Sequence, residues 1–247
     1  MYLSRVCVRR DQGLAALGRV IVPDDDDRRL DVAHRLIWSL FGDTPDTRRD
    51  FLWREEEPGR FVILSRRAPA NPGLFEIEMR QFSPALSKGD RLAFRLRANA
   101  TVATRDGAGK QHRHDVVMNA IQSCETGARA EPRKRELGWL ETDDGRIEPP
   151  LALRTWLERQ GTRTGFSIEA LQVISYEKRQ IPRDTHKNQR RKSKADVVFG
   201  IADLDGILVV HDPEQFVAGL CAGFGRAKAF GCGLMLIKRP QTAAGSA

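Results

Sequence analysis

The chain has 247 residues, enough for one large or two small domains, and 41 basic against 33 acidic side chains give it a net charge of +8. This basic excess favours a polyanionic partner such as nucleic acid, whereas 4 scattered cysteines without metal-ligand spacing indicate neither a zinc site nor a disulfide framework and fit a reducing cytoplasm. With no apolar N-terminal region and no run approaching about 18 apolar residues, the sequence predicts neither a signal peptide nor a transmembrane helix.

The first half of the chain predicts a helix and a set of strands. Alternating segments and a hairpin with its turn mark the strands, and apolar residues at helical spacing mark the helix. The strands are expected at 3–8, 51–56, 60–66 and 74–82, and the helix at 30–41. The acidic residues 24–27 before the helix favour its N-terminal dipole, and Pro58-Gly59 turns a hairpin. Residues 69–73 hold too much proline and glycine for a good second helix.

One histidine lies beside the apolar stripe of the predicted helix. The stripe consists of Leu30, Ala33, Leu36, Ile37, Leu40 and Phe41. His34 is one position off its centre, so the ring should flank the buried face and stay reachable from solvent. A lone histidine on a helix is more often an ordinary boundary residue than a catalytic one, and the helix pattern by itself leaves both interpretations open.

The second half repeats the order of the first. A strand begins at Arg91 and places Arg95, Arg97 and Asn99 on one face, which we expect to be exposed, cationic and suited to an RNA backbone or a partner subunit. The later elements are expected as a helix at 149–160, strands at 166–176 (continuing into Lys178 and Arg179), 195–203 and 206–210, a helix at 213–222 and a strand at 234–237. Residues 111–136 cannot be assigned from their pattern.

This order predicts an α+β fold of two tandem ferredoxin-like (RRM-like) βαββαβ domains. The N-terminal domain is expected at residues 1–83, a linker at 84–90, the C-terminal domain at 91–240 and a disordered tail at 241–247. Domains of this kind usually bind single strands through aromatic residues on the sheet, and the strands here lack such a pattern. Basic and glycine-rich loops are the better candidates, which favours a structured RNA hairpin as ligand.

Residues 178–194 are strongly basic, with 8 cations against a single acid, Asp184. Such a segment is too charged to pack into a core, so it is either a disordered solubilising loop or a polyanion-binding one. We favour RNA contact, because cations that neutralise phosphates release counterions and gain affinity. The candidate RNA-binding residues here are Lys178, Arg179, Arg183, Arg190, Arg191 and Lys192.

A glycine-rich loop precedes the last strand, with 4 glycines in the 11 residues from Gly223 to Gly233. Glycine permits positive φ and close backbone approach, and cations between the glycines suit a polyphosphate. A dinucleotide-binding fingerprint is rejected, since a helix precedes the loop and a short strand follows it. A plain helix-to-strand turn with glycine C-caps remains the alternative. The candidate RNA contacts are Gly223, Gly225, Arg226, Lys228 and Gly231.

Four stretches carry a family resemblance. They are MYLSRV at 1–6, DVAHRLIWSLF at 31–41, FRLRAN at 94–99 and the glycine loop with its GCGL ending. Together they resemble the CasE family, the repeat-processing endoribonucleases of type I-E CRISPR systems. The resemblance implies tandem ferredoxin-like domains, metal-independent cleavage of a repeat RNA hairpin, and retention of the product within the Cascade complex. It places the family's catalytic histidine at His34, and it puts Asp31 where members often carry a tyrosine, so the tyrosine's role is not carried over.

The implied chemistry uses the nucleophile that RNA itself carries, the 2′-hydroxyl, so no metal or other cofactor is expected. The products would be a 2′,3′-cyclic phosphate and a 5′-hydroxyl, with His34 as general acid or base. Asp31, one helical turn earlier, would favour the imidazolium form and so the acid role. Candidates to stabilise charge on the phosphate are Arg35, Arg226 and Lys228, and candidates for a second catalytic group are Tyr176, Lys178 and His186.

Two other functions stay open on the sequence. A non-catalytic RNA-binding subunit with the same two domains would keep the basic loop and the glycine turn. A general nucleic-acid-binding protein would show little preference for a CRISPR repeat. The spacing of His112 and His114 could indicate a metal pair, but no cysteine or carboxylate partner is evident and we expect no metal site.

Overall fold

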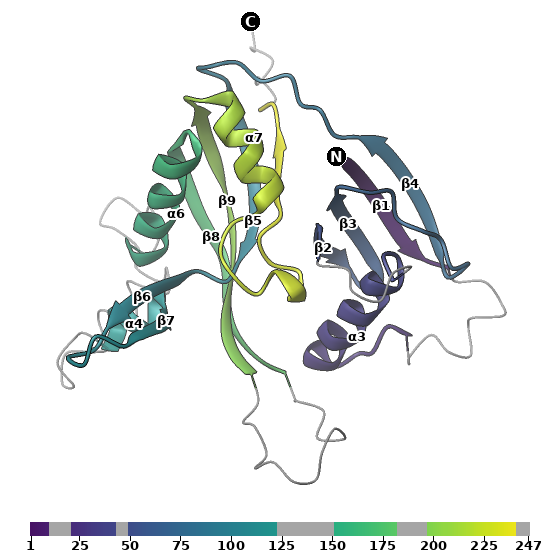
Figure 1. The fold of residues 1–247 in the computed structure, drawn as a ribbon, viewed down its shortest axis with the longest axis horizontal. Helices are drawn as coiled ribbons and strands as arrows, with labels where there is room; N and C mark the ends of the chain where they lie inside the picture. The colour runs from purple at the N-terminus through teal and green to yellow at the C-terminus, as the bar shows by residue number, and fades with distance from the viewer. Residues whose placement is uncertain (10–20, 43–48, 123–150, 182–196, 241–247) are drawn as a thin grey trace, which may run out of the picture.

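The computed structural model of the chain describes residues 1–9, 21–42, 49–122, 151–181 and 197–240. Two four-stranded antiparallel sheets stand side by side, one from each half of the chain, with a small two-stranded hairpin beside the second (Figure 1). In the part of the chain that is described, no helix is both long and apolar enough to span a membrane.

The first sheet has the strand order β2-β3-β1-β4. Its strands are β1 (Tyr2–Val8), β2 (Phe51–Glu57), β3 (Arg60–Ser65) and β4 (Phe75–Gln81), and helix α3 (Asp26–Ser39) joins β1 to β2. No helix lies between β3 and β4, where every residue is described, as the proline and glycine content of this segment predicts. The first half is therefore a ferredoxin-like unit without its second helix.

The second sheet has the equivalent order β10-β5-β9-β8. Its strands are β5 (Arg91–Ala98), β8 (Phe166–Ile181), β9 (Val197–Val210) and β10 (Met235–Lys238), and its helices are α6 (Leu151–Thr164) and α7 (Pro213–Ala222). Between β5 and α6 the chain adds β6 (Thr101–Arg105), β7 (Gln111–Asp115) and α4 (Val116–Gln122). The last two of these begin the segment that the sequence pattern left unassigned.

One expectation for the long ribbon of β8 and β9 was wrong. The expected break at Leu204-Asp205 does not exist, because β9 is a central strand and both residues pair with β5 on one side and β8 on the other. The strand β8 continues through Lys178 and Arg179, as expected, and ends at Ile181. Residues 182–196, with Arg183, His186, Arg190, Arg191 and Lys192, lie outside the described part of the chain.

Helix α3 forms where the acidic run and the apolar stripe predict it. The side chain of Asp25 caps the helix by accepting a hydrogen bond from the backbone N–H of Arg28, at 2.8 Å, and further acids occupy the first turn. The stripe packs on the first sheet, with Ala33 and Ile37 buried against Phe51 and Trp53. His34 lies at the edge of this packing and is half-buried.

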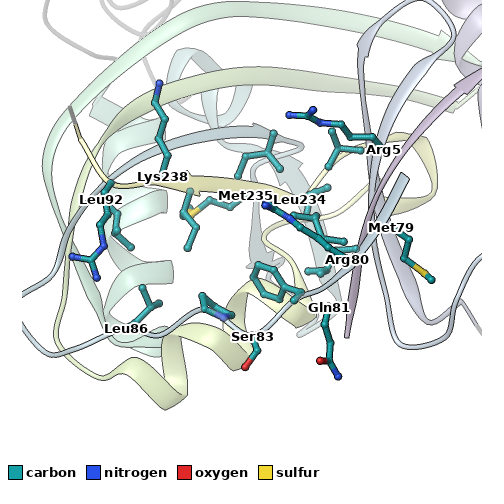
Figure 2. A pocket seen from close by; sticks show the side chains of 18 of the residues that line it. Arg5, Met79, Arg80, Gln81, Ser83, Leu86, Leu92, Leu234, Met235 and Lys238 are labelled. Atoms are coloured by element: carbon teal, nitrogen blue, oxygen red, sulfur yellow. The ribbon is translucent and has the colours of Figure 1, made fainter. Parts of the chain in front are cut away.

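The two halves meet face to face. A small apolar cluster joins Leu52, Val62 and Leu64 of the first sheet to Leu234, just before β10 of the second. Beside it opens a groove of about 820 Å³, whose wall continues along the connection that follows β4. Figure 2 shows this groove with leucine and methionine side chains inside it and the cations Arg5, Arg80 and Lys238 around them. The expected linker at 84–90 forms part of this connection, and the proposed domain boundaries remain predictions.

Candidate active site

His34 lies at the junction of the two halves. Its Nδ1 is 2.8 Å from the carbonyl oxygen of Ala229, a residue 195 positions later in the chain. The ring is held between two aromatic neighbours, Trp38 on its own helix at 6.3 Å between centroids and Phe230 of the glycine loop at 5.4 Å. No described residue hydrogen-bonds to Nε2. One nitrogen of the ring is thus engaged by the protein, and the other is available to a ligand.

The carbonyl of Ala229 belongs to a short 3₁₀ turn, η2 (Lys228–Phe230), within the glycine loop. In Figure 1 this turn reaches from the second half of the chain towards α3. The indole N–H of Trp53, a buried residue of β2, donates to the same carbonyl oxygen at 3.2 Å. Two side chains of the N-terminal half, His34 and Trp53, therefore hydrogen-bond to the same backbone oxygen of the C-terminal half.

The glycines of this loop are positioned against protein. At Gly223, Gly225 and Gly231 the angle φ is close to +75°, which favours glycine. A Cβ on Gly223 would lie 2.7 Å from Leu52, and one on Gly231 would lie 3.1 Å from the ring of Trp53. A Cβ on Gly225 would lie 2.7 Å from the carbonyl oxygen of Asn99. These contacts favour the helix-to-strand turn over close RNA approach as the reason for glycine at these positions.

Asp31 does not bind His34. Its carboxylate forms an ion pair with Arg35, at 2.7 Å, across one turn of the exposed face of α3. The contacts of the His34 ring are instead with Ala229, Trp38 and Phe230. Asp31 and His34 are therefore neighbours along the helix, as expected, but the carboxylate of Asp31 binds Arg35 and not the imidazole.

The cations of the loop differ in their surroundings. Arg226 is exposed, and its side chain has no partner in the described chain; its backbone N–H donates to the carbonyl of Asn99 at 3.0 Å. The ammonium of Lys228 donates to the carbonyl of Ala222 at the end of α7, at 2.6 Å. Burial lowers the pKa of Lys228, and the nearby charge of Arg49 lowers it further. Arg226 is thus the cation of this loop most accessible to a phosphate.

The expectation of an exposed cationic face on β5 is confirmed only at Arg95, because Arg97 and Asn99 on this face are covered. Asn99 is buried and donates to the carbonyl of Gly200, at 2.8 Å. Arg97 binds the carboxylate of Asp203 through Nη2, at 2.8 Å, and Arg54 of the first sheet binds it at 3.2 Å. Only Arg95 is more than half exposed, with Asp205 at 3.4 Å. The guanidinium of Arg97 is therefore bound to Asp203 at the junction between the halves.

The end of the β8–β9 ribbon presents different residues on its two faces. Cross-strand partners project to the same side, and Arg179 pairs with Phe199. Arg179 binds Asp26 of α3 at 2.9 Å, and Phe199 stacks on Phe230 at 5.6 Å, so this face lies against the His34 site. Lys178, exposed and without a partner among the described residues, projects from the opposite face.

Tyr176 lies on that opposite face as well. Its hydroxyl donates to the carboxylate of Asp115 at 2.8 Å, and the same carboxylate oxygen accepts backbone N–H groups of Val117 and Met118 at the start of α4. Burial and the neighbouring charge of Asp115 raise the pKa of Tyr176 well above its ordinary value. These contacts give the tyrosine a structural role at the α4 insertion.

The histidines of β7 belong to the β6–β7 hairpin. His112 binds the carboxylate of Asp106 at 2.8 Å, and its ring lies 6.4 Å from that of His114. Across the described ranges, no group of three or more histidine, cysteine, aspartate or glutamate side chains could hold a metal ion.

Sequence patterns missed the residues that define this site in space. Trp53 and Phe230 look like ordinary core or loop aromatics, and Asp203 looks like one acid in a strand. The alternation of β2 could have placed Trp53 on the helix-facing side of its sheet. No local pattern connects it to a carbonyl 176 residues away.

Comparison with known proteins identifies relatives over most of the chain. The family model described as "CRISPR associated protein" matches residues 1–239. The CRISPR system Cascade subunit CasE of Escherichia coli (strain K12) is 28% identical over 225 residues, which cover 89% of this chain and 96% of that protein. These matches confirm the resemblance drawn from the four sequence stretches.

Solved structures share the fold. Cas6e from Escherichia coli str. K-12 aligns with a TM-score of 0.58 at 22% identity, covering 96% of this chain and 98% of that one. The CRISPR endoribonuclease Cse3 bound to 19 nt RNA aligns with a TM-score of 0.60 at 21% identity, covering 96% and 100%. Thermus thermophilus Cse3, bound to an RNA representing a pre-cleavage complex, aligns with a TM-score of 0.58 at 21% identity, covering 96% and 98%. The prediction of two ferredoxin-like units is confirmed.

Proposed function

This chain belongs to the family of CRISPR-associated proteins, and we propose that it is an endoribonuclease that binds and cleaves the repeat hairpin of precursor CRISPR RNA. In the same proposal it acts in the cytoplasm and stays bound to its product as a subunit of Cascade. The relative named as the Cascade subunit CasE and the RNA-bound Cse3 structures support this assignment. The observation that carries it is the placement of His34, whose Nδ1 is engaged while Nε2 has no partner among the described residues.

The proposed reaction is an attack of the 2′-hydroxyl on the adjacent phosphorus, which leaves a 2′,3′-cyclic phosphate and a 5′-hydroxyl. The protein has to align the nucleophile, move protons and stabilise the developing charge, and a metal ion is not required for any of these tasks. A histidine is suited to proton transfer because it titrates near neutral pH. His34 is positioned to protonate the departing 5′-oxygen or to accept the proton of the 2′-hydroxyl through Nε2.

In this proposal two exposed cations, Arg35 and Arg226, stabilise the negative charge that develops on the phosphate. Arg35 follows His34 on α3, and its ion pair with Asp31, at 2.7 Å, sets the direction of the guanidinium. Arg226 offers an exposed cation from the other side of the junction. In this proposal Asp31 acts through Arg35. Asp31→Asn should then lower the cleavage rate no further than Arg35→Ala does, and a larger loss would assign the carboxylate a separate role.

In this proposal, affinity for the hairpin comes from the basic residues at the end of β8 and in the segment that follows it. Lys178 at the end of β8 leads into residues 182–196, whose cations complete the basic segment. Arg179 contributes from the face that lies against α3, where it now binds Asp26. Such contacts neutralise phosphates without reading the sequence, so they set the strength and salt dependence of binding.

The test is single-turnover cleavage of end-labelled repeat RNA. His34→Ala should bind the hairpin nearly as the unmodified chain does, because a neutral imidazole adds little to phosphate neutralisation. Its cleavage rate should fall by roughly 10²–10⁴-fold, the usual contribution of a positioned acid or base. His112→Ala, on the β6–β7 hairpin, is the matched control and should cleave normally.

Other outcomes would favour the other functions. Normal cleavage by His34→Ala would remove this residue from the mechanism, and binding without any cleavage by the unmodified chain would identify a non-catalytic RNA-binding subunit. Activity that is abolished by EDTA and restored by a divalent ion would contradict the metal-independent reaction. Equal affinity for an unrelated hairpin would indicate a general nucleic-acid-binding protein.

A further inference from the structure

The contact between His34 and Ala229 decides which ring nitrogen carries the proton. A backbone carbonyl oxygen only accepts hydrogen bonds, so Nδ1, at 2.8 Å, must be the donor. A neutral ring held in this way carries its hydrogen on Nδ1 and a lone pair on Nε2, and a protonated ring presents an N–H at Nε2. Both forms direct the exchangeable position away from Ala229.

The accepting oxygen is itself held in place by several contacts. The indole N–H of Trp53 donates to it at 3.2 Å, from a side chain that is 1% exposed. The turn that carries it closes with a hydrogen bond from the backbone N–H of Phe230 to the carbonyl of Ala227, at 2.8 Å. Ala227 adopts a left-handed conformation with φ of 49°, the one non-glycine residue with positive φ in the described chain. A backbone in this region is uncommon and persists where the surrounding structure enforces it.

The loop can approach Trp53 because position 231 is glycine. A Cβ there would lie 3.1 Å from the indole ring, closer than side-chain carbons normally come. The ring of Phe230 covers the imidazole on the same side and stacks in turn on Phe199. Three contacts thus confine the imidazole. The ring of Phe230 and the hydrogen bond to Ala229 come from the C-terminal half of the chain, and the ring of Trp38 comes from the same helix as His34.

We propose that the carbonyl of Ala229 is the orienting partner of His34, fixing the Nδ1–H tautomer so that Nε2 is the atom that exchanges a proton with RNA. Trp53 and Gly231 are positioning residues, because Trp53 donates to this carbonyl and Gly231 lets the loop lie close to the indole. The inference rests on the catalytic role proposed for His34. In this proposal the catalytic role of His34 requires that the glycine loop packs against the first half of the chain. Each half alone is therefore inactive.

The direct test is nitrogen NMR of the full chain labelled with ¹⁵N-histidine, at a pH where the His34 ring is neutral. The signals of His34 are identified by their absence in His34→Asn. We expect a pyrrole-type shift for Nδ1 and a pyridine-type shift for Nε2. The opposite pattern, or the averaged shifts of two exchanging tautomers, would overturn the proposal without touching the cleavage assay.

The functional test removes the second donor to the carbonyl. Trp53→Phe keeps an aromatic ring in the core and deletes the N–H, and Gly231→Ala should push the loop away from the indole. Each variant should bind the hairpin as before but cleave about 10–100-fold more slowly, the usual effect of losing a residue that orients a functional group. Phe61→Leu is the control, because Phe61 of β3 packs on the same indole, at 5.8 Å between centroids, but donates no hydrogen bond to the carbonyl of Ala229.

The outcomes separate this inference from the proposed function. If Trp53→Phe and Gly231→Ala cleave at the same rate per folded molecule as Phe61→Leu, the carbonyl does not position His34. If His34→Ala retains activity, the proposed role of the histidine fails whatever its tautomer. Should Trp53→Phe fail to fold, the tautomer in the unmodified chain still decides the question.

Discussion

Arg54 on β2 and Asp203 on β9 form an ion pair across the junction of the two halves, with 3.2 Å between Nη2 and Oδ1. The side chain of Arg54 is 8% exposed, and its Nε and Nη1 have no hydrogen-bond partner in the described chain. Burial lowers the pKa of this guanidinium, with the charge of Asp203 acting against the shift. Arg97, which is partly buried, binds the same carboxylate, so one acid compensates two cations.

Removing that acid should therefore be costly. Asp203→Ala would leave Arg54 and Arg97 close together without a counter-charge, and we expect the free energy of unfolding to fall by about 3–5 kcal/mol. Urea unfolding followed by tryptophan fluorescence measures this. Arg54→Met should cost much less, because it deletes an incompletely bonded charge and leaves the pair of Arg97 and Asp203 intact. An Arg54→Met variant as unstable as Asp203→Ala would contradict this account of the junction.

The ion pair between Asp26 and Arg179 predicts a pH dependence. Burial alone would raise the pKa of Asp26, but hydrogen bonds from Arg179 and Arg29 outweigh it and hold that pKa below its ordinary value of 3.8. The ionised carboxylate therefore stabilises the folded chain above pH 3.8, and this contribution is lost as the pH falls through the lowered pKa.

Asp26→Asn should reduce the free energy of unfolding at pH 7 by up to about 1 kcal/mol, a small value because the carboxylate is half exposed. The difference from the unmodified chain should shrink as the pH falls below 3.8. Urea titrations across this range check the prediction, with Asp24→Asn as control, at an exposed position whose carboxylate has no partner among the described residues. A deficit that stays constant with pH would mean that the charge of Asp26 is not what stabilises the junction.

The glycine loop predicts a second effect on stability. Gly225→Ala should cost about 1 kcal/mol for a side chain at positive φ. It should cost more still because its Cβ would lie 2.7 Å from the carbonyl of Asn99. Gly89→Ala isolates the first contribution, since Gly89 has φ of +92° and no atom lies within 4 Å of the place its Cβ would take. Thermal unfolding of both variants gives the comparison. Equal losses would show that the loop yields at Gly225 and has room for closer contact with a ligand.

The basic segment should contribute affinity without chemistry. Changing Arg190, Arg191 and Lys192 together to alanine should weaken hairpin binding and lower the slope of log K against log salt by about 2–3 units, one for each lost phosphate contact. Affinities measured at several salt concentrations give the slope. The same change at Arg154, Arg159 and Arg163 of α6 alters the net charge equally and should leave the slope nearly unchanged. Equal slopes for both triple variants would mean that the segment does not touch phosphate.

Tyr176 should prove dispensable for cleavage. Its hydroxyl is committed to Asp115 at the start of α4, so Tyr176→Phe should cost about 1 kcal/mol of stability for the lost hydrogen bond and leave the single-turnover rate unchanged. Cleavage and urea unfolding measured on the same preparation separate the two effects. A rate that falls by orders of magnitude at normal stability would give this tyrosine a catalytic role after all.

The sequence by itself determined most elements of the two ferredoxin-like units and their order, but not the insertion of β6, β7 and α4. Alternation and helical spacing depend on which face of a segment is buried, and that requirement is local, so α3, α7 and most strands could be placed from nearby residues. The N-terminal acids of α3 and the proline and glycine between β3 and β4 carry equally local information. The apolar stripe also placed His34 beside the buried face of α3, as the structure shows, although it could not say what the ring contacts.

Tertiary structure alone decided which groups meet at the junction. Ala229 is 195 positions from His34, and nothing in either neighbourhood specifies that a backbone carbonyl will face the imidazole. Arg97 shows the same limit, because alternation predicted its side of β5 correctly but not that a second sheet, with Arg54, would cover that side. Burial and pairing of this kind arise when the two ferredoxin-like units pack against each other. The hydrophobic pattern of each unit shows which of its own faces are buried, but not which residues of the other unit they will contact.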